Sequence, residues 1–168
     1  GIYCATLNQG TLMLFDHARE RPNELAIDDG TRTRTFAELV DRIALFAAFL
    51  LDEAGFVPGD PLSLLMGNRV EGIELLLGGI FAGQWVTPIN WHLAEEEIEY
   101  VVQDSDSRLI VTDERYAPMA HRIAGGTPGL RVVEVGAELD GRLAGIEARP
   151  IDLDGPAGGN MNYTSGTT

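Results

Sequence analysis

The sequence predicts an α/β fold: a mostly parallel β-sheet with helices on both faces. Short apolar runs alternate along the chain with amphipathic segments of helical period, and the links between them are short. Most of these runs are apolar throughout, which is typical of strands covered by helices on both faces. We therefore expect residues 1–168 to form a single α/β domain or subdomain.

The expected elements follow one another in a regular order. Helices are expected at residues 12–21, 35–54, 68–81, 95–103, 114–124 and 139–145. Strands are expected at residues 25–27, 32–34, 62–66, 85–89, 109–111, 131–135 and 161–163. Residues 136–159 are rich in glycine and less regular than the rest.

Turn and capping residues fix the first elements. Asp29-Gly30 can turn the first strand back on itself as a small hairpin. Thr35 and Glu38 have the spacing of a capping box, in which each side chain satisfies a free backbone N–H at the start of a helix. An apolar face then continues for five turns to Gly55, a typical C-terminal glycine.

The later helices repeat this pattern. Asn68 and Glu71 form a second expected cap pair, and Gly79 and Gly83 are expected to allow close packing of the following helix on the sheet. Glu95–Glu97 fall in the first turn of the next helix, where negative charge suits the helix dipole. We interpret these three carboxylates as a solvated helix start and not as a metal site. Asp113 is the expected cap of the helix after that.

Composition excludes several classes of function. The net charge is −14 and the twelve basic residues are scattered arginines, so no basic stripe for nucleic acid exists. The single cysteine, Cys4, excludes an internal disulfide framework and fits a reducing compartment. No signal peptide and no apolar run of about 18 residues is visible. We therefore expect a cytoplasmic protein without a membrane span.

The candidate binding site is the hydroxyl-rich turn formed by Thr164, Ser165, Gly166, Thr167 and Thr168. The strand expected at 161–163 leads directly into it. A glycine lets backbone N–H groups converge on an anion, and hydroxyl groups add further donors for phosphate oxygens. The turn differs from a GxxxxGK[ST] loop because the chain contains no lysine. Composition alone favours a polar surface turn, because turns of Ser, Thr and Gly are common.

Several segments, in their order and spacing, resemble the adenylate-forming enzymes, the superfamily of acyl-CoA synthetases, luciferases and peptide-synthetase adenylation domains. The segments are Thr35-Phe36-Ala37-Glu38-Leu39, Gly59-Asp60, Gly67-Asn68-Arg69, Pro88-Ile89-Asn90, Asp104–Asp113 and Tyr163–Thr168. Most are moderately specific scaffold positions, whereas Tyr163–Thr168 is similar to the start of the family's phosphate-binding loop. Ser165-Gly166-Thr167-Thr168, together with Pro88–Leu93, looks more like a fatty-acid or aryl-acid CoA ligase than a peptide-synthetase domain.

The resemblance implies a two-step reaction. ATP and a carboxylate give an acyl-adenylate and pyrophosphate, and the thiol of coenzyme A then displaces AMP to form a thioester. Thr164–Thr168 would hold the β- and γ-phosphates through donors and position. Mg²⁺ is expected beside the phosphates. The resemblance covers the N-terminal third of such an enzyme, up to a point inside the loop, so residues 1–168 alone are expected to be inactive.

A second hypothesis is a non-catalytic module of the same fold that binds a nucleotide or a partner. Self-association into a homo-oligomer is a further expectation, because the surface that the rest of such an enzyme would cover should be apolar and favour association. The remaining candidates are better explained structurally. His92 is expected in a packed loop, His17 and His121 lack metal-ligand spacing, and Asp104 and Asp106 fit a solvated turn.

Overall fold

The computed structural model describes residues 9–156 and 158–163, with side chains from residue 13 onward. The helices are α1 (Gln9–Glu20), α2 (Phe36–Ala48), a π-helical turn η1 (Phe49–Glu53), α3 (Val70–Phe81), α4 (Glu95–Asp104), α5 (Ala117–Gly126) and α6 (Ala137–Leu143). The strands are β1 (Leu25–Asp28), β2 (Thr33–Thr35), β3 (Pro61–Leu65), β4 (Trp85–Pro88), β5 (Leu109–Thr112), β6 (Arg131–Glu134) and β7 (Gly159–Asn160).

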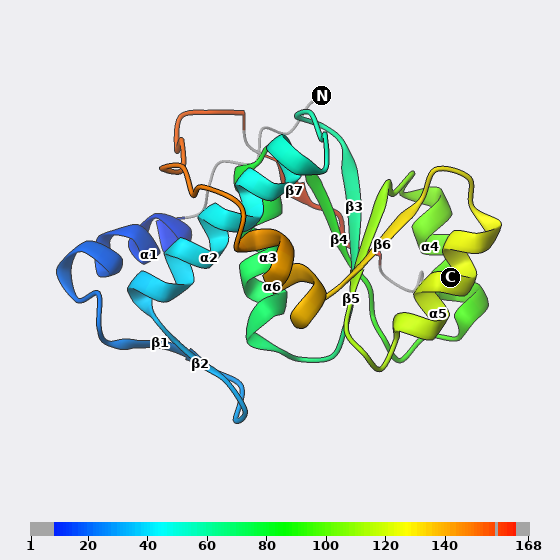
Figure 1. Cartoon of the computed structure of the whole chain (residues 1–168), viewed down its shortest axis with the longest axis horizontal. Coiled ribbons are helices and arrows are strands. Elements are labelled where there is room, and N and C mark those ends of the chain that lie inside the picture. The colour runs from blue at the N-terminus through cyan, green and yellow to red at the C-terminus, as the bar shows by residue number, and fades with distance from the viewer. Residues whose placement is uncertain (1–8, 157, 164–168) are drawn as a thin grey trace.

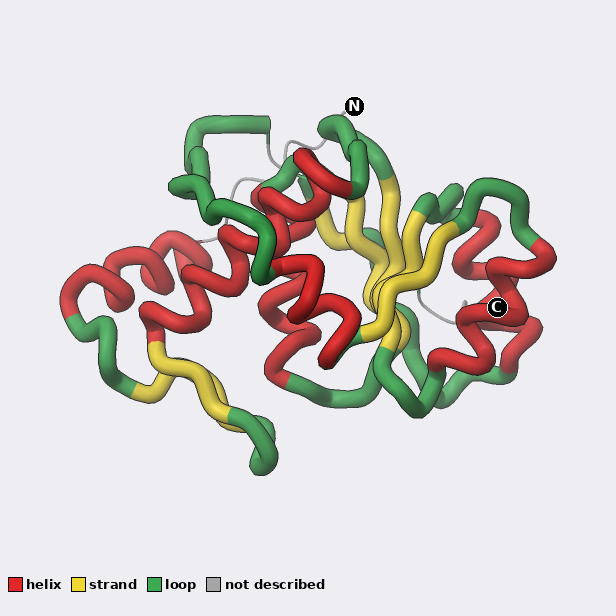
Figure 2. The backbone as a smooth tube through the Cα atoms, viewed as in Figure 1, coloured by secondary structure: helices red, strands yellow, loops and turns green. Residues whose placement is uncertain are grey.

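The predicted fold class is confirmed. Five strands form one parallel sheet in the order β6-β5-β3-β4-β7, and β1 and β2 form a separate antiparallel hairpin. Helices α2, α3 and α6 lie on one side of the sheet and α4 and α5 on the other (Figure 1). The hairpin projects beyond α2, away from the sheet (Figure 2). The chain therefore has three layers, with a small appendage at its N-terminal end.

Both faces of the central strands are buried, as their unbroken apolar sequence predicts. Successive side chains of a strand point to opposite faces. Leu64 and Val111 therefore join the core beneath α2, α3 and α6, whereas Leu65 and Ile110 join the core beneath α4 and α5. Such strands are continuously apolar because neither face meets water.

The capping box at the start of α2 is confirmed. Thr35 Oγ1 accepts the Glu38 N–H at 3.3 Å, and Glu38 Oε2 accepts the Thr35 N–H at 2.8 Å. The helix ends in the wider η1 turn, in which the Ala54 N–H reaches back to the Phe49 carbonyl at 2.8 Å. Gly55, with φ of 69°, then takes the left-handed conformation expected of a terminal glycine.

Two adjacent glycines let α3 approach both of its neighbours. A Cβ on Gly79 would lie 2.5 Å from Val86 Cγ2 on β4, and a Cβ on Gly78 would lie 2.9 Å from the Ile43 carbonyl on α2. The packing role predicted for Gly79 is therefore confirmed. Gly78 has the same role toward α2. Gly83, predicted to share the role of Gly79, lies beyond the end of α3 with φ of 84° and approaches Pro58 and Pro156 instead of the sheet.

The predicted cap pair of α3 is wrong. Arg69, and not Asn68, directly precedes the helix, and the carboxylate that accepts the Val70 N–H is Asp29 in the hairpin, at 2.8 Å. Glu71 is 4% exposed and is paired with Arg32 and Arg69. The sequence pattern predicted a local cap from Asn68 and Glu71, but the carboxylate that accepts the Val70 N–H is 41 residues earlier in the sequence.

Several other boundaries differ from the predictions by a few residues, and two of these differences concern segments near the carboxyl edge of the sheet. Helix α5 begins at Ala117, because Asp113 instead accepts the N–H groups of Arg115 and Tyr116 in the preceding turn. The last strand is Gly159–Asn160 and not residues 161–163. It lies so close to β4 that a Cβ on Gly158, just before the strand, would fall 1.9 Å from the Gln84 carbonyl oxygen.

Candidate functional site

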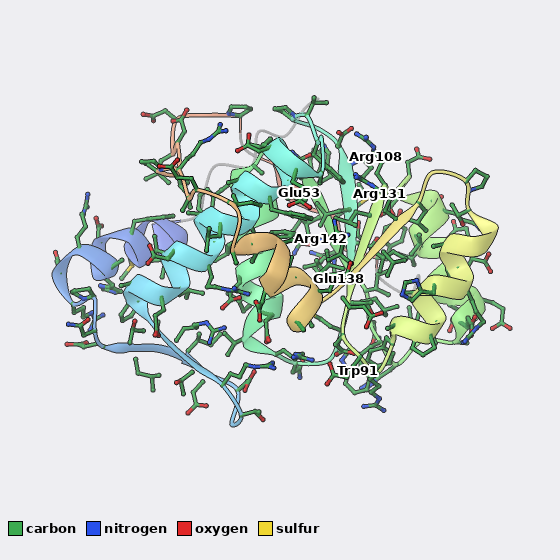
Figure 3. All side chains as sticks on the ribbon, viewed as in Figure 1. Glu53, Trp91, Arg108, Arg131, Glu138 and Arg142 are labelled. Atoms are coloured by element: carbon green, nitrogen blue, oxygen red, sulfur yellow. The ribbon has the colours of Figure 1, made fainter. Side chains whose placement is uncertain are left out.

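The candidate site lies at the carboxyl edge of the parallel sheet, where ligands of open α/β sheets bind. A hollow of about 440 Å³ opens there between the segments that follow β3 and β4. Its lining includes the side chains of Met66, Arg69, Ile73, Asn90 and Trp91. Trp91 marks this end of the sheet, and Arg108 and Arg131 mark the opposite end (Figure 3).

Asp113, directly after β5, organises this edge. Its Oδ2 accepts the Gly67 N–H at 2.9 Å, and its Oδ1 accepts the N–H groups of Arg115 and Tyr116 at 3.1 and 3.3 Å. One buried carboxylate thus joins the end of β3 to the turn that follows β5. Because these backbone donors occupy both of its oxygens, Asp113 serves as a brace for the edge.

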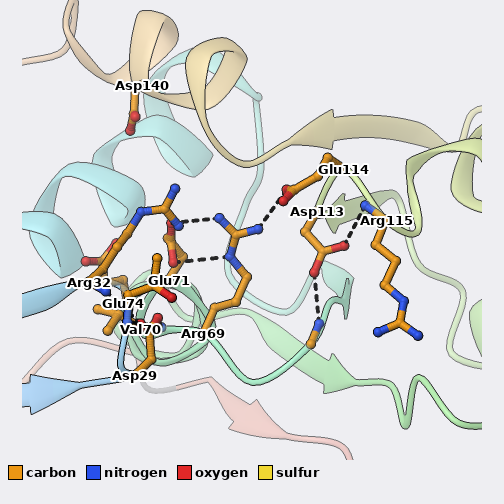
Figure 4. A network of polar contacts seen from close by, with 12 residues as sticks. Asp29, Arg32, Arg69, Val70, Glu71, Glu74, Asp113, Glu114, Arg115 and Asp140 are labelled. Carbon is orange, nitrogen blue, oxygen red and sulfur yellow. Dashed lines mark hydrogen bonds and ion pairs between the residues drawn. The ribbon is translucent and has the colours of Figure 1, made fainter.

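Arg69 forms one rim of the hollow and is held in place by two carboxylates (Figure 4). Its guanidinium is 3.2 Å from Glu71 Oε1 and 2.8 Å from Glu114 Oε2. Partial burial disfavours the charged form, but the hydrogen bonds and negative charge of Glu71 and Glu114 outweigh it, so the pKa of Arg69 lies above its ordinary value. The guanidinium therefore stays protonated, and its charge is balanced by the two carboxylates that hold it in place.

Behind this rim, α3 carries a second buried carboxylate that the sequence did not single out. Glu74 is 1% exposed, and its two oxygens accept from Arg34 Nε at 2.7 Å and Arg42 Nε at 3.1 Å. Arg34 comes from β2 and Arg42 from α2. The network attaches the hairpin and α2 to the helix that supports the site. Its members are 32 and 40 residues apart in sequence, so no local pattern indicates it.

A second hollow of about 410 Å³ lies beside the first, and Asn90 lines both. Its lining also includes Leu93, Glu97, Tyr100 and Tyr163. The Tyr163 hydroxyl donates to Asp104 Oδ2 at 2.7 Å, across 59 positions of sequence. Burial, followed by the hydrogen bond to Asp104, raises the pKa of Tyr163 to about 12. The hydroxyl is therefore a protonated donor at neutral pH.

The predicted phosphate-binding residues Thr164, Ser165, Gly166, Thr167 and Thr168 lie outside the described residues, as does Cys4. The structure does bring Tyr163, the residue directly before them, to the carboxyl edge of the sheet. Strand β7 runs parallel to β4, and the Met161 N–H donates to the Val86 carbonyl at 2.7 Å. The described part of the chain thus leads to the position from which a loop after β7 would depart.

Among the other candidates, Asp104 differs from its prediction, because it is the last residue of α4 and accepts from Tyr163 instead of lying in a solvated turn. His92 lies in the turn after β4, where its N–H donates to Asn90 Oδ1 at 3.1 Å, and His121 pairs with Glu134. Within residues 9–156 and 158–163, no three His, Cys, Asp or Glu side chains gather closely enough to hold a metal ion. Glu95 in the first turn of α4 pairs with Arg122. No helix within these ranges has the length and apolarity needed to cross a membrane.

The structure is an α/β fold with two hollows at the carboxyl edge of its parallel sheet, and comparison with known proteins identifies its family. The family described as "AMP-binding enzyme" matches residues 14–168. Because this match covers most of the chain, the protein belongs to the AMP-binding enzyme family. The resemblance inferred from the sequence segments is confirmed.

The similar proteins are ligases. A 2-succinylbenzoate–CoA ligase of Geobacillus kaustophilus is 38% identical over 153 residues, which cover 88% of this chain and 28% of the relative. A medium/long-chain-fatty-acid–CoA/3-oxocholest-4-en-26-oate–CoA ligase of Mycobacterium tuberculosis is 32% identical over 139 residues, covering 80% of this chain and 25% of that one. The chain therefore spans less than a third of the length of these relatives.

Solved structures agree with this assignment. The N-terminal domain of FACL13 from Mycobacterium tuberculosis superimposes with a TM-score of 0.77 at 29% identity, covering 93% of this chain and 41% of that one. An anthranilate CoA ligase bound to anthranoyl-AMP gives a TM-score of 0.80 at 22% identity, and this second likeness concerns the fold alone.

Proposed function

We propose that this chain is the N-terminal part of an ATP-dependent acyl-CoA synthetase. Such an enzyme joins a carboxylate to AMP with release of pyrophosphate and then transfers the acyl group to the thiol of coenzyme A. The observation that carries the proposal is the family match over residues 14–168, since the relatives named above are CoA ligases. These names also suggest the substrate class, an aryl or fatty carboxylic acid.

In this proposal the described residues build and orient the scaffold of the site. Asp113 joins the ends of β3 and β5, and the arginine–glutamate network joins α3 to α2 and the hairpin. Thr164–Thr168 would hold the β- and γ-phosphates of ATP by backbone and hydroxyl donors, so that the carboxylate meets the α-phosphorus. A bound Mg²⁺ would neutralise part of the phosphate charge. We also propose that the protein is located in the cytoplasm and that it forms homo-oligomers.

The test is ATP–pyrophosphate exchange by the protein expressed from its native reading frame. The panel should contain 2-succinylbenzoate, benzoate and saturated fatty acids of increasing length, each with and without coenzyme A. Exchange that depends on one of these acids, followed by thioester formation with coenzyme A, is the expected result. A polypeptide of residues 1–168 should show neither activity. Nucleotide binding without exchange for any acid would favour a non-catalytic binding module instead.

A further inference from the structure

We propose that Tyr163 is a positioning residue for adenylate formation, acting through its hydrogen bond to Asp104 at the end of α4. This proposal rests on the proposed function and deepens it. The residue touches neither substrate nor reacting atoms in this role. It fixes the point at which the chain leaves the sheet for Thr164–Thr168.

The contact joins an edge strand to a helix that is firmly held. Tyr163 O–H donates to Asp104 Oδ2 at 2.7 Å, the short distance typical of a hydroxyl bound to a carboxylate. Asp104 is the last residue of α4, whose inner face buries Ile98, Val101 and Val102 in the sheet core. The acceptor therefore sits on a rigid element.

Asp104 is an unusual residue for its place. The C-terminal end of a helix carries partial negative charge, so a carboxylate there is disfavoured unless donors satisfy it. Two tyrosine hydroxyls supply these donors, Tyr163 at 2.7 Å and Tyr100 at 3.4 Å. The raised pKa of Tyr163, about 12, keeps its hydroxyl protonated over the whole working range of pH. The pair is thus a stable anchor.

The segment that leads to the loop is fixed at both of its ends. Its first attachment is the Met161 N–H on the Val86 carbonyl of β4, at 2.7 Å, and its second is Tyr163 on α4. The ring of Tyr163 also packs against the apolar cluster beneath α4 and α5. Thr164 follows directly, so a shift of Tyr163 would move the first residue of the predicted loop.

The two half-reactions separate a positioning role from a general structural one. Adenylation requires the β- and γ-phosphates of ATP to be held in place, whereas a supplied acyl-adenylate has neither phosphate. Loss of the Tyr163 anchor should therefore impair the first step and spare thioester formation from acyl-adenylate and coenzyme A. A variant that is merely less well folded should lose both steps alike.

The experiment compares Tyr163→Phe with Tyr100→Phe in the protein from its native reading frame. Tyr100 is the matched control, because it donates to the other oxygen of the same carboxylate but precedes no loop. Tyr163→Phe should lower kcat for ATP–pyrophosphate exchange by about tenfold, since displacements near 1 Å can reduce rates a hundredfold. Thioester formation from supplied acyl-adenylate should stay within about twofold of the wild type, and Tyr100→Phe should resemble the wild type in both assays.

A double-mutant cycle with Asp104→Ala completes the test. If Tyr163 acts through Asp104, the double variant should exchange no more slowly than Tyr163→Phe alone, because each change removes the same contact. Unchanged exchange in Tyr163→Phe, or an equal loss in both half-reactions, overturns the positioning role and leaves the proposed function standing. A wild-type protein that activates no carboxylic acid overturns the proposed function, and this assignment with it.

Discussion

The Asp29 carboxylate accepts the first backbone N–H of α3, that of Val70, at 2.8 Å. The acceptor belongs to the turn of the β1–β2 hairpin, 41 residues earlier in the sequence. A helix start is therefore satisfied from outside the helix. Asp29 also accepts the N–H groups of Thr31 and Arg32 at 2.9 and 2.7 Å, so one side chain shapes the hairpin turn and docks it on α3.

The first prediction concerns acid stability. The hydrogen bond from Val70, followed by those from Arg32 and Thr31, lowers the pKa of Asp29 to about 2 from its ordinary 3.8. A carboxylate whose pKa is lower in the folded state stabilises the fold above its unfolded pKa. This contribution should be present above about pH 4 and be lost as the pH falls toward 2. Thermal unfolding followed from pH 6 to pH 2 should show part of the loss in this window.

The variant Asp29→Ala should have a melting temperature a few degrees lower at neutral pH and a weaker dependence on pH in the acid range. Asp28→Ala is the control, because the Asp28 carboxylate accepts the Gly30 N–H within its own turn and does not reach α3. Equal acid sensitivity of Asp29→Ala and the wild-type protein would show that this carboxylate does not carry the effect.

The second prediction concerns the buried Glu74 on α3. Its removal in Glu74→Ala leaves Arg34 and Arg42 without the carboxylate that holds them at 2.7 and 3.1 Å. Breaking a buried pair costs about 3–5 kcal/mol, and about 2–3 kcal/mol is expected here because both arginines keep some contact with solvent. Urea unfolding measures the difference.

An exposed pair on the same layer provides the control for Glu74. Glu53 and Arg142 meet at 3.2 Å with both side chains about 40% exposed, so Glu53→Ala should cost less than about 1 kcal/mol. Similar losses in the two variants would contradict a special role for burial. The sequence did not predict the network of Glu74 with Arg34 and Arg42, because Glu74 has the position of an ordinary charged residue in an amphipathic helix.

The sequence predicted those features that depend on near neighbours. Alternating apolar runs gave the order of elements and the buried strands, and Thr35 with Glu38 gave the start of α2. Pairings across many residues could not be obtained in this way. Asp29 with Val70, Glu74 with Arg34 and Tyr163 with Asp104 become neighbours only when the sheet and its helices assemble. The family resemblance pointed to the candidate loop and included Asp104, Asp113 and Tyr163, but it did not indicate which groups these three side chains bind.

The third prediction tests the contact of α3 with the sheet. Alanine at Gly79 would place its Cβ 2.5 Å from Val86 Cγ2, so α3 or β4 must move. Overpacking of this kind costs about 1–3 kcal/mol. Gly72→Ala on the same helix is the matched control, since its Cβ would meet Met66 Sδ at an ordinary 3.7 Å. Gly72→Ala should be neutral or stabilising by up to about 1 kcal/mol. The free energy of unfolding of both variants, measured by chemical denaturation, tests the prediction.

The fourth prediction links the edge of the sheet to the proposed activity. Alanine at Gly158 would bring its Cβ within 1.9 Å of the Gln84 carbonyl oxygen, a backbone atom that cannot turn away. We expect β7 to separate from β4, with loss of the hydrogen bonds from Gly158 to Ile80, Gly159 to Gln84 and Met161 to Val86. At about 0.5–1.5 kcal/mol for each bond, the loss in stability should be about 2–4 kcal/mol.

Because β7 carries Tyr163 toward α4, Gly158→Ala should also slow ATP–pyrophosphate exchange at temperatures where the variant is still folded. Gly145→Ala provides the control within the same glycine-rich segment, as its Cβ would meet the Arg142 carbonyl at 3.8 Å. That variant should keep both stability and exchange close to those of the wild type. If Gly158→Ala loses stability but exchanges at the wild-type rate, the position of β7 does not govern the loop. If both fall together while thioester formation from supplied acyl-adenylate persists, the edge strand and its tyrosine act as one positioning unit.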